Sequence, residues 1–198
     1  RSEGGFTSIS KNATTGAITT QSSISSAGVS SFDANTMAVE AGTGITGGTG
    51  TIYRSSVQRV GGIITTRILI DLTGLRSTAS GDIIGVNGTS NVCHIGQITA
   101  ARNGTILTGS MECFEAPAGG DPDINVHSAT EGTGVEDGAI SDLTETLLVN
   151  AGDATLGSKV YFTAVPAADE FLYLTLGDTT DADYTAGKLF IELMGYEA

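Results

Sequence analysis

Side chains that could bind a cation are the first candidates for chemistry in this chain. Asp121, Asp123 and Asn125 alternate with apolar residues, which is the spacing of oxygen donors that opens a calcium-binding loop. The sixth position of such a loop is Val126 instead of glycine and the twelfth is Gly132 instead of glutamate, so the segment is not an EF-hand. A second group of carboxylates falls in another expected loop: Asp178, Asp181 and Asp183. For both groups we prefer a hydrated turn to a calcium site, and we assign no metal ligand and no cofactor.

The residues that serve as nucleophiles and bases form no catalytic pattern. The chain has no Gly-x-Ser-x-Gly motif, and neither His94 nor His127 lies in the sequence pattern of a triad. We interpret His94 as a residue on the polar face of a strand and His127 as a residue at a loop edge. Residues 185–188 (Thr-Ala-Gly-Lys) resemble the end of a phosphate-binding loop but lack its first glycine and its final hydroxyl residue. We therefore assign no catalytic residue, and we expect that the protein is not an enzyme.

The charge of the chain is acidic and unevenly distributed. It holds 9 basic and 22 acidic residues, for a net charge of −13, and 17 of the acidic residues lie in residues 111–198. Nucleic-acid binding depends on lysine and arginine, so this balance argues against a nucleic-acid partner. The apolar stretches are too short to cross a membrane as a helix, and no signal peptide is recognisable. We expect neither a nucleic acid nor a membrane as a partner.

Composition divides the chain into residues 1–50 and 51–198. The first segment consists mainly of small and polar residues with scattered apolar ones, so it buries too little surface to fold alone. An extended arm that docks on a partner and a plain linker both fit this composition. For approximately residues 1–40, we predict an arm that orders when it docks. The second segment is expected to form a single β domain.

Short β-branched runs separated by turn residues indicate an all-β fold. Residues 51–60 and 63–72 flank Gly61-Gly62, which predicts a hairpin with a two-residue turn. Further strands are expected at 82–86, 124–128, 159–165, 170–176 and 188–194. One short helix is expected from residue 140 to residue 147. The pattern predicts an antiparallel β-sandwich or jelly-roll-like body with an extended N-terminal arm and at most one or two short helices.

The two cysteines fall in a second expected hairpin. Residues 92–101 and 105–115 flank Arg102-Asn103-Gly104, which is typical of a three-residue turn. In that register Cys93 lies opposite Cys113, on a buried face that also carries Leu107. Such neighbours could form a disulfide, but we prefer a reduced buried pair, because no secretory signal is present.

Five segments carry a resemblance to a known protein family. They are TIYRSSVQRVGGIITTRILIDLTGL, GDIIG, HIGQITAARNGTIL, CFEAPAGGDPDINV and GDTTDADYTAGKLFIELMG. The chain resembles capsid cement, or decoration, proteins of marine tailed bacteriophages over roughly residues 50–195. These segments hold turn and strand signatures and no catalytic residues.

The resemblance implies a non-enzymatic virion protein that binds the outer surface of a capsid and stabilises it. It would be made in the host cytoplasm, contact the major capsid protein and act as a homo-oligomer, a dimer or a trimer. A tail-tube or fibre component is the alternative within the same particle. An extracellular carbohydrate-binding β-sandwich is the alternative from another class, although no Trp and 6% aromatic residues leave few platforms for sugar stacking.

Overall fold

Strands dominate the computed structural model of this chain, with 48% of residues in strands and 7% in helices. The structure describes residues 9–11, 18–21 and 38–197. It divides into two compact units, Arg1–Ala38 and Val39–Ala198, which are described separately. The all-β, sandwich-like prediction is confirmed.

The first unit contains two paired strands. Strand β1 (Ile9–Lys11) runs antiparallel to strand β2 (Ile18–Gln21). The rest of the arm predicted for residues 1–40 lies outside the described residues, apart from those that belong to the second unit.

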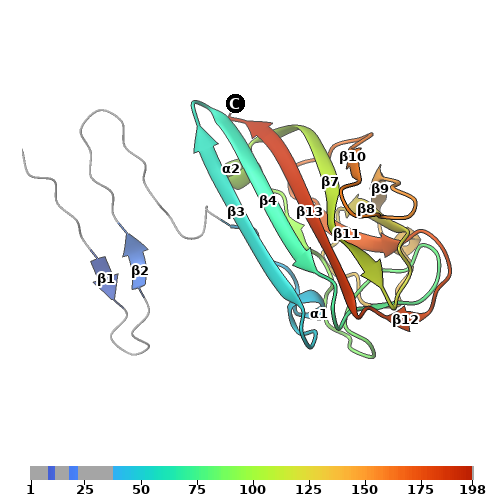
Figure 1. Ribbon diagram of the computed structural model, residues 1–198. Helices are drawn as coiled ribbons and strands as arrows, with labels where there is room; N and C mark the ends of the chain where they lie inside the picture. Colours follow the sequence, from blue (N-terminus) through green and yellow to red (C-terminus); the bar gives the residue numbers. More distant parts are fainter. Residues whose placement is uncertain (1–8, 12–17, 22–37, 198) are drawn as a thin grey trace, which may run out of the picture. The chain divides into compact units, whose positions relative to one another are not determined.

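The larger sheet of the second unit has five antiparallel strands in the order β10-β7-β13-β4-β3 (Figure 1). Their bounds are β3 Ile52–Val60, β4 Ile63–Asp71, β7 Thr105–Ala118, β10 Lys159–Tyr161 and β13 Ala186–Tyr196. Strand β13 occupies the centre and pairs along its length with both β7 and β4.

The smaller sheet has four antiparallel strands in the order β6-β11-β8-β9. Their bounds are β6 Gly96–Gln97, β8 Ile124–Ala129, β9 Glu145–Val149 and β11 Phe171–Leu176. Strands β5 (Arg76–Ser77) and β12 (Ala182–Asp183) form a separate short pair. The helical elements of the described residues are short: α1 Thr43–Thr46, α2 Ala100–Asn103 and a 3₁₀ turn at Ile140–Asp142.

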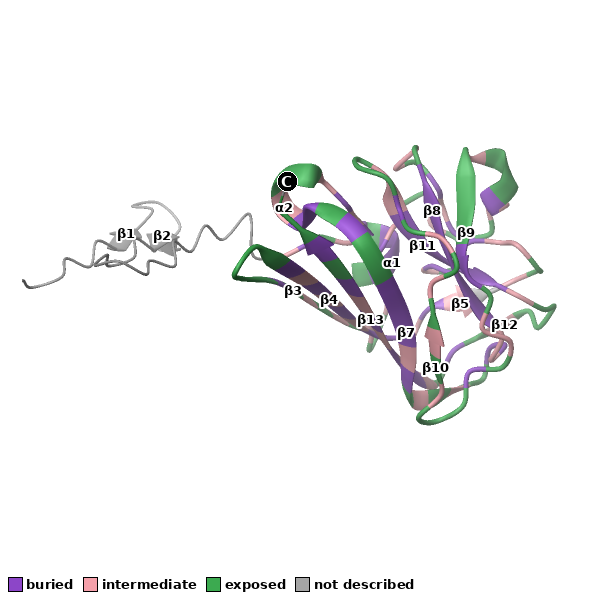
Figure 2. Cartoon of the chain, turned by 90° about the horizontal axis from the view of Figure 1, so that it is seen from above, coloured by how far each residue is buried: buried purple, intermediate pink, exposed green. Residues whose placement is uncertain are grey.

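One apolar core joins the two sheets. Alternate residues of β4 and β13, such as Ile68 and Ile191, are buried in the same cluster as Val126 and Leu174 of the smaller sheet. Side chains alternate between the faces of a strand, so the neighbouring residues of β4 and β13 lie on the opposite face of the larger sheet. Figure 2 shows this alternation of buried and more exposed residues along the strands.

The hairpin predicted around Gly61-Gly62 is confirmed. Val60 lies opposite Ile63, and the two glycines between them have φ of 58° and 85°. Two successive positive φ angles are the geometry of a type I′ turn, which matches the twist of the paired strands. Glycine adopts these angles without the steric cost that a side chain brings.

The second unit begins earlier than the composition indicated. The boundary was expected at residue 50, but Val39 and Ile45 are buried in the core. The glycine-rich stretch between them packs through its backbone: the Gly42 and Gly44 amides donate to the His94 and Val92 carbonyls, both at 2.8 Å. Composition alone does not reveal that this segment is part of the folded unit, because its contacts depend on few side chains and on close approach of the backbone.

The hairpin predicted across residues 102–104 is wrong. Residues 100–103 form α2 instead, and Thr99, which caps its N-terminus, accepts a hydrogen bond from the Arg102 amide through its side chain. The helical turn redirects the chain, so that β6 pairs with β11 while β7 pairs with β13. Cys113 consequently lies opposite Leu189, and the Cys93 amide donates to the Gly134 carbonyl, so the cysteines are not cross-strand neighbours.

A β-bulge explains a second difference in this region. Along β7, Ile106 lies opposite Gly195 and Thr108 lies opposite Met194, which leaves Leu107 without an opposing residue. An extra residue in one strand turns the following side chains to the other face. Leu107 is therefore 55% exposed instead of buried as predicted.

The helix predicted over residues 140–147 is also wrong. Only the 3₁₀ turn at Ile140–Asp142 is helical, and the chain then enters β9, which pairs with β8. Leu148 and Val149 are buried together, which suits a strand that ends in the core and not a helical spacing. The strands predicted at 124–128, 170–176 and 188–194 are confirmed. The strand predicted at 159–165 is confirmed only over residues 159–161, and residues 82–86 form isolated bridges at Asp82, Ile83 and Gly85.

Candidate binding surface

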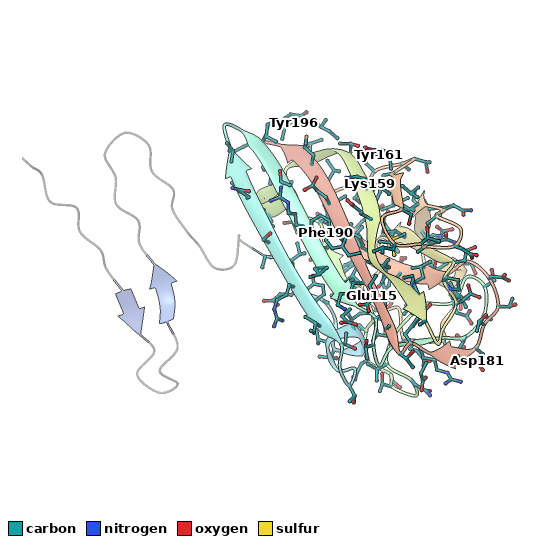
Figure 3. All side chains as sticks on the ribbon, in the orientation of Figure 1. Glu115, Lys159, Tyr161, Asp181, Phe190 and Tyr196 are labelled. Atoms are coloured by element: carbon teal, nitrogen blue, oxygen red, sulfur yellow. The ribbon has the colours of Figure 1, made fainter. Side chains whose placement is uncertain are left out.

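The face of the five-stranded sheet that points away from the core carries charged, aromatic and hydroxyl side chains on neighbouring strands. We call it the outer face. Its rows run across the strands: Tyr161 of β10, Ser110 of β7, Glu192 of β13 and Arg67 of β4 lie opposite one another in turn. The adjacent row contains Lys159, Glu112, Phe190 and Leu69. Figure 3 shows several of these side chains on the sheet.

Aromatic and apolar side chains occupy much of the outer face. Phe114 and Phe190 are stacked, with ring centroids 5.1 Å apart and planes 9° from parallel. The register of β7 and β13 shifts beside Phe114, which sets it out of step with its neighbours and over the Phe190 ring. Tyr161 is 67% exposed, and Met194 is exposed two residues before the end of β13.

Ion pairs between neighbouring strands neutralise the charges of the outer face. Arg67 Nε lies 2.8 Å from Glu192 Oε2, and Lys159 Nζ lies 3.5 Å from Glu112 Oε2. Lys188 contacts two carboxylates, those of Glu115 and Asp71, one on each neighbouring strand. Partners that lie directly opposite in register contribute modestly to stability, about 0.2–1 kcal/mol each.

Neutrality distinguishes this face from the rest of the chain. With Arg54 of β3, the outer face holds four basic side chains (Arg54, Arg67, Lys159 and Lys188) and four acidic ones (Asp71, Glu112, Glu115 and Glu192). The whole chain carries a net charge of −13. The excess of carboxylates therefore lies elsewhere, and the outer face is the surface that a partner could cover without burying a large net charge.

The surroundings of Asp71, at the edge of this face, lower the pKa of its carboxyl group. Burial by itself would raise the pKa of Asp71, but hydrogen bonds from the Thr73 hydroxyl and amide and the charge of Lys188 outweigh it. The pKa of Asp71 consequently lies below its ordinary value. The carboxylate stays charged at neutral pH and holds Lys188 on the sheet.

A shallow depression of about 230 Å³ lies on the outer face beside β10. Its lining combines the Tyr161 ring, the Lys159 ammonium group, the Glu192 carboxylate and the hydroxyls of Thr108 and Ser110. The small Ser110 side chain stands between Tyr161 and Glu192 in the row, which leaves room for the hollow. The depression can accept a group that offers both an apolar surface and hydrogen bonds.

The acidic loops are organised by hydrogen bonds within the protein. Asp121 accepts from the Asp123 amide at 2.9 Å and from the Thr180 amide at 3.1 Å. Asp181 and Asp183 both pair with Arg76, at 2.7 and 2.9 Å. Among the described residues, no group of three or more histidine, cysteine or acidic side chains is arranged to hold a metal ion.

The negative charge of Asp123 is unfavourable in this loop. Burial, followed by the charges of Asp121, Asp153 and Asp178, raises the pKa of Asp123 above its ordinary value. Its Oδ1 atom is buried without a hydrogen-bond partner, and it fits only because Gly177 has no side chain there. Asp121 and Asp123 share one loop, whereas Asp153 and Asp178 come from two others, which explains why the sequence spacing alone grouped them differently.

The histidines lie in the smaller sheet and its surroundings, and each has its own contacts. His127 lies inside β8 and not at a loop edge; its Nδ1 atom is 3.0 Å from Thr175 Oγ1. His94 packs against Phe171 with ring centroids 5.0 Å apart. Burial lowers the pKa of both histidines, for His127 against the opposing effect of Glu145, so both are neutral at pH 7.

Both cysteines are buried with free thiols, as predicted, although they are not neighbours on one hairpin. Burial raises the pKa of the Cys93 thiol to about 12 and also raises that of Cys113. Thiolates are the reactive form, so neither cysteine has the environment of a nucleophile.

No binding role was expected from the sequence for any residue of the outer face. A signal was present in residues 188–194, where Lys188, Phe190, Glu192 and Met194 alternate with buried leucine and isoleucine residues. An exposed strand face with Phe and Met at alternate positions indicates a surface that a partner covers.

Comparison with known proteins adds no relative. No family model, no curated protein and no solved structure matches the chain. No helix within the described ranges is long and apolar enough to cross a membrane.

Proposed function

We propose that this chain is a non-enzymatic virion protein that binds the outer surface of a tailed-phage capsid and stabilises it. The observation that carries the proposal is the outer face of the five-stranded sheet, which is neutral, rich in aromatic and apolar groups and exposed. In this proposal the outer face contacts the major capsid protein, and the acidic loops face solvent.

The chemistry of the outer face supports a protein partner. Contiguous exposed apolar groups with a polar surround are typical of protein interaction sites, and aromatic side chains are enriched in them. Phe114, Phe190, Tyr161 and Met194 supply the apolar contacts, and the ion pairs keep the neighbouring charges satisfied. Many modest contacts, repeated over a shell, would add up to strong attachment.

The resemblance of residues 50–195 to capsid decoration proteins is the reason for naming a capsid as the partner. The absence of a readable nucleophile–base pattern in the sequence agrees with a non-enzymatic role. A tail-tube or fibre component would use the same kind of face, and the location of the chain in the particle distinguishes the two roles.

The N-terminal arm has a separate place in this proposal. Its scattered apolar residues could dock on neighbouring capsid proteins; Ile9 and Ile18 belong to β1 and β2, and most of the others lie outside the described ranges. Because Val39 belongs to the core of the second unit, the deletion that tests the arm should end at residue 37. We expect the deleted chain to fold and to attach to capsids less tightly; unchanged attachment would show that the segment is only a linker.

Carbohydrate binding is the second candidate function, and the depression beside β10 favours it. The Tyr161 ring could stack on a sugar, and Lys159, Glu192, Thr108 and Ser110 could bond its hydroxyls. Tyr161 is the single aromatic side chain among the residues that line the depression, so the apolar contact with a sugar would be small. A glycan array with the wild-type chain and Tyr161→Ala distinguishes this role, since sugar binding would depend on that ring.

The decisive experiment is a cryo-EM map of the whole phage particle. We expect density for the five-stranded sheet on the outside of the head, with the outer face against the major capsid protein. Density in the tail would favour the tail component. Absence of the chain from the particle would overturn the proposal.

A further inference from the structure

Strand β3 is a long, regular edge that no described strand covers. It contains nine residues, lies at the end of the five-stranded sheet and pairs with β4 over its full length without a register shift. The other edge strands of the two sheets are shorter: β10 and β6 have three and two residues, and β9 has five with a shift in its pairing. Native proteins usually protect such an edge, because its free backbone groups can pair with another chain.

The hydrogen-bond pattern identifies which backbone groups of β3 point outward. The Leu72 amide donates to the Gly187 carbonyl at 2.8 Å, so even-numbered residues of β4 bond β13 and odd-numbered ones bond β3. Bonding directions alternate along an antiparallel strand. The residues of β3 opposite odd-numbered residues of β4 are even-numbered. The free groups therefore belong to the odd-numbered residues: Tyr53, Ser55, Val57 and Arg59.

Val39, the first residue of the second unit, does not bond the outward backbone groups of this edge. The Val39 amide donates to Ser55 Oγ at 3.0 Å, and its carbonyl accepts from Tyr53 Oη at 3.0 Å. Both contacts use side chains on the core side of β3 and not its outward backbone. Among the described residues, the outward groups have one partner: the Arg54 guanidinium, which donates to the Tyr53 carbonyl at 2.7 Å.

We propose that β3 is a dimer interface, in which β3 of a second copy pairs antiparallel with it about a two-fold axis at Ser56. In this register Tyr53 pairs with Arg59 of the second copy, and Ser55 pairs with its Val57. Every residue of β3 whose backbone groups point away from β4 then pairs with a residue of the same kind in the second copy, as the alternation of an antiparallel ladder requires. The two five-stranded sheets become one continuous sheet.

The side chains on the outer face of β3 are self-complementary in the same register. Ile52 and Val60, which are 45% and 66% exposed, lie opposite each other across the interface. Arg54 lies opposite Gln58, and Ser56 lies opposite its own copy, so no like charges meet directly. A shift by two residues in either direction places Val60 opposite Gly50 or Ile52 opposite Gly62, and neither Ile52 nor Val60 then faces an apolar residue. This self-complementarity favours a second copy over an unrelated strand.

The inference is independent of the proposed function but is compatible with it. A two-fold axis through an antiparallel pair runs perpendicular to the sheet, so both outer faces lie on the same side of the dimer. Such a dimer would present twice the contact area to one surface.

Site-specific cross-linking of the full-length chain tests the register. Directly opposed residues of a non-hydrogen-bonded pair have Cα atoms about 4.5 Å apart, within the range of a disulfide. We expect Ser56→Cys to give a covalent dimer with a mild oxidant, and the wild type to give none, because Cys93 and Cys113 are buried. Gln58→Cys alone should not cross-link, since its two copies would be four residues apart along the strands, about 13 Å. A mixture of Arg54→Cys and Gln58→Cys should cross-link. Absence of the Ser56→Cys dimer, or equal cross-linking by Gln58→Cys alone, would overturn the proposal.

The oligomeric state provides a second test that needs no cysteine. We expect the wild type to be a dimer by light scattering or sedimentation. Ser56→Asp should raise its dissociation constant about tenfold or more, because it places two carboxylates opposite each other. Thr146→Asp, a matched change at an exposed position of β9 in the smaller sheet, should leave the dimer intact. A monomeric wild type, a dimer insensitive to Ser56→Asp, or an oligomer lost only on deletion of residues 1–37 would each contradict the proposal.

Discussion

Phe114 and Phe190 lie face to face on neighbouring strands of the five-stranded sheet, with their ring centroids 5.1 Å apart. The rings belong to the face away from the core, so their contact does not fill the interior. Two large aromatic rings stacked at the surface supply a flat apolar platform, while the ion pairs beside them remain exposed to solvent. This relationship is the structural centre of the candidate binding surface.

The stacked rings should stabilise the folded chain by a small but measurable coupling. We expect a double-mutant cycle with Phe114→Ala and Phe190→Ala to give a coupling free energy of about 0.5–1 kcal/mol in urea unfolding, because aromatic pairs gain this much beyond burial. A matched cycle with Phe114→Ala and Leu147→Ala, a 38% exposed leucine of β9 in the smaller sheet, should give additive effects. Coupling near zero in both cycles would mean that the stack is not formed in solution.

Asn103 should be a strong determinant of stability. It is buried, accepts from the Thr99 amide at 2.9 Å and donates to Thr66 Oγ1 at 2.7 Å. Asn103→Ala leaves both partners without a hydrogen bond, so the free energy of unfolding should fall by about 2–4 kcal/mol. The exposed Asn150→Ala should change it by less than about 0.5 kcal/mol. Equal effects of the two substitutions in urea unfolding would show that the link between α2 and β4 is unimportant.

Asp123 should destabilise the folded chain at neutral pH. Its raised pKa means that the folded state binds a proton more tightly than the unfolded state, so stability falls as the pH rises through that pKa. Asp123→Asn removes this cost, and we expect a higher Tm than the wild type at pH 7. The difference should shrink as the pH falls towards the ordinary pKa of aspartate.

The control for Asp123 is the exposed Asp142→Asn, which should change the Tm at pH 7 by less than Asp123→Asn does. Thermal unfolding between pH 4 and 8 provides the comparison. A lower Tm for Asp123→Asn at pH 7 would contradict the electrostatic interpretation of this loop.

The thiols should be unreactive in the folded chain and free after unfolding. Both are buried, and burial raises the pKa of each, so little thiolate forms near pH 8. Titration with a thiol reagent without reductant should find almost no reaction under native conditions and two thiols in denaturant. No reactive thiol in denaturant would indicate a disulfide and would contradict the structure.

Local signals explain the parts of the fold that the sequence predicted well. The hairpin at Gly61-Gly62 was predictable, because the turn chemistry and the flanking β-branched residues agree. The turn at residues 102–104 was not, because the same residues suit a hairpin loop and a helical turn. The long-range hydrogen bond between Asn103 and Thr66 favours the helical turn, and a local pattern does not contain it.

The candidate site was predictable only in part for a similar reason. The alternation along β13 indicates that Phe190 and Met194 share an exposed face. The position of Phe114 above Phe190 depends on a register shift between β7 and β13, which no local spacing reveals. In the acidic loops the sequence spacing suggested metal ligands, whereas in the structure Asp121 accepts a hydrogen bond from the Asp123 amide, and Asp181 and Asp183 pair with Arg76.

Binding to capsids that lack this chain tests the central claim most directly. We would measure co-sedimentation of the wild type, Met194→Asp on the outer face and Leu147→Asp, which changes a 38% exposed leucine of β9 in the smaller sheet. Circular dichroism would confirm that both variants are folded. The claim predicts saturable binding of the wild type and of Leu147→Asp, and binding of Met194→Asp that is weaker by about tenfold or more. Equal binding of the three chains, or no binding of the wild type, would contradict it.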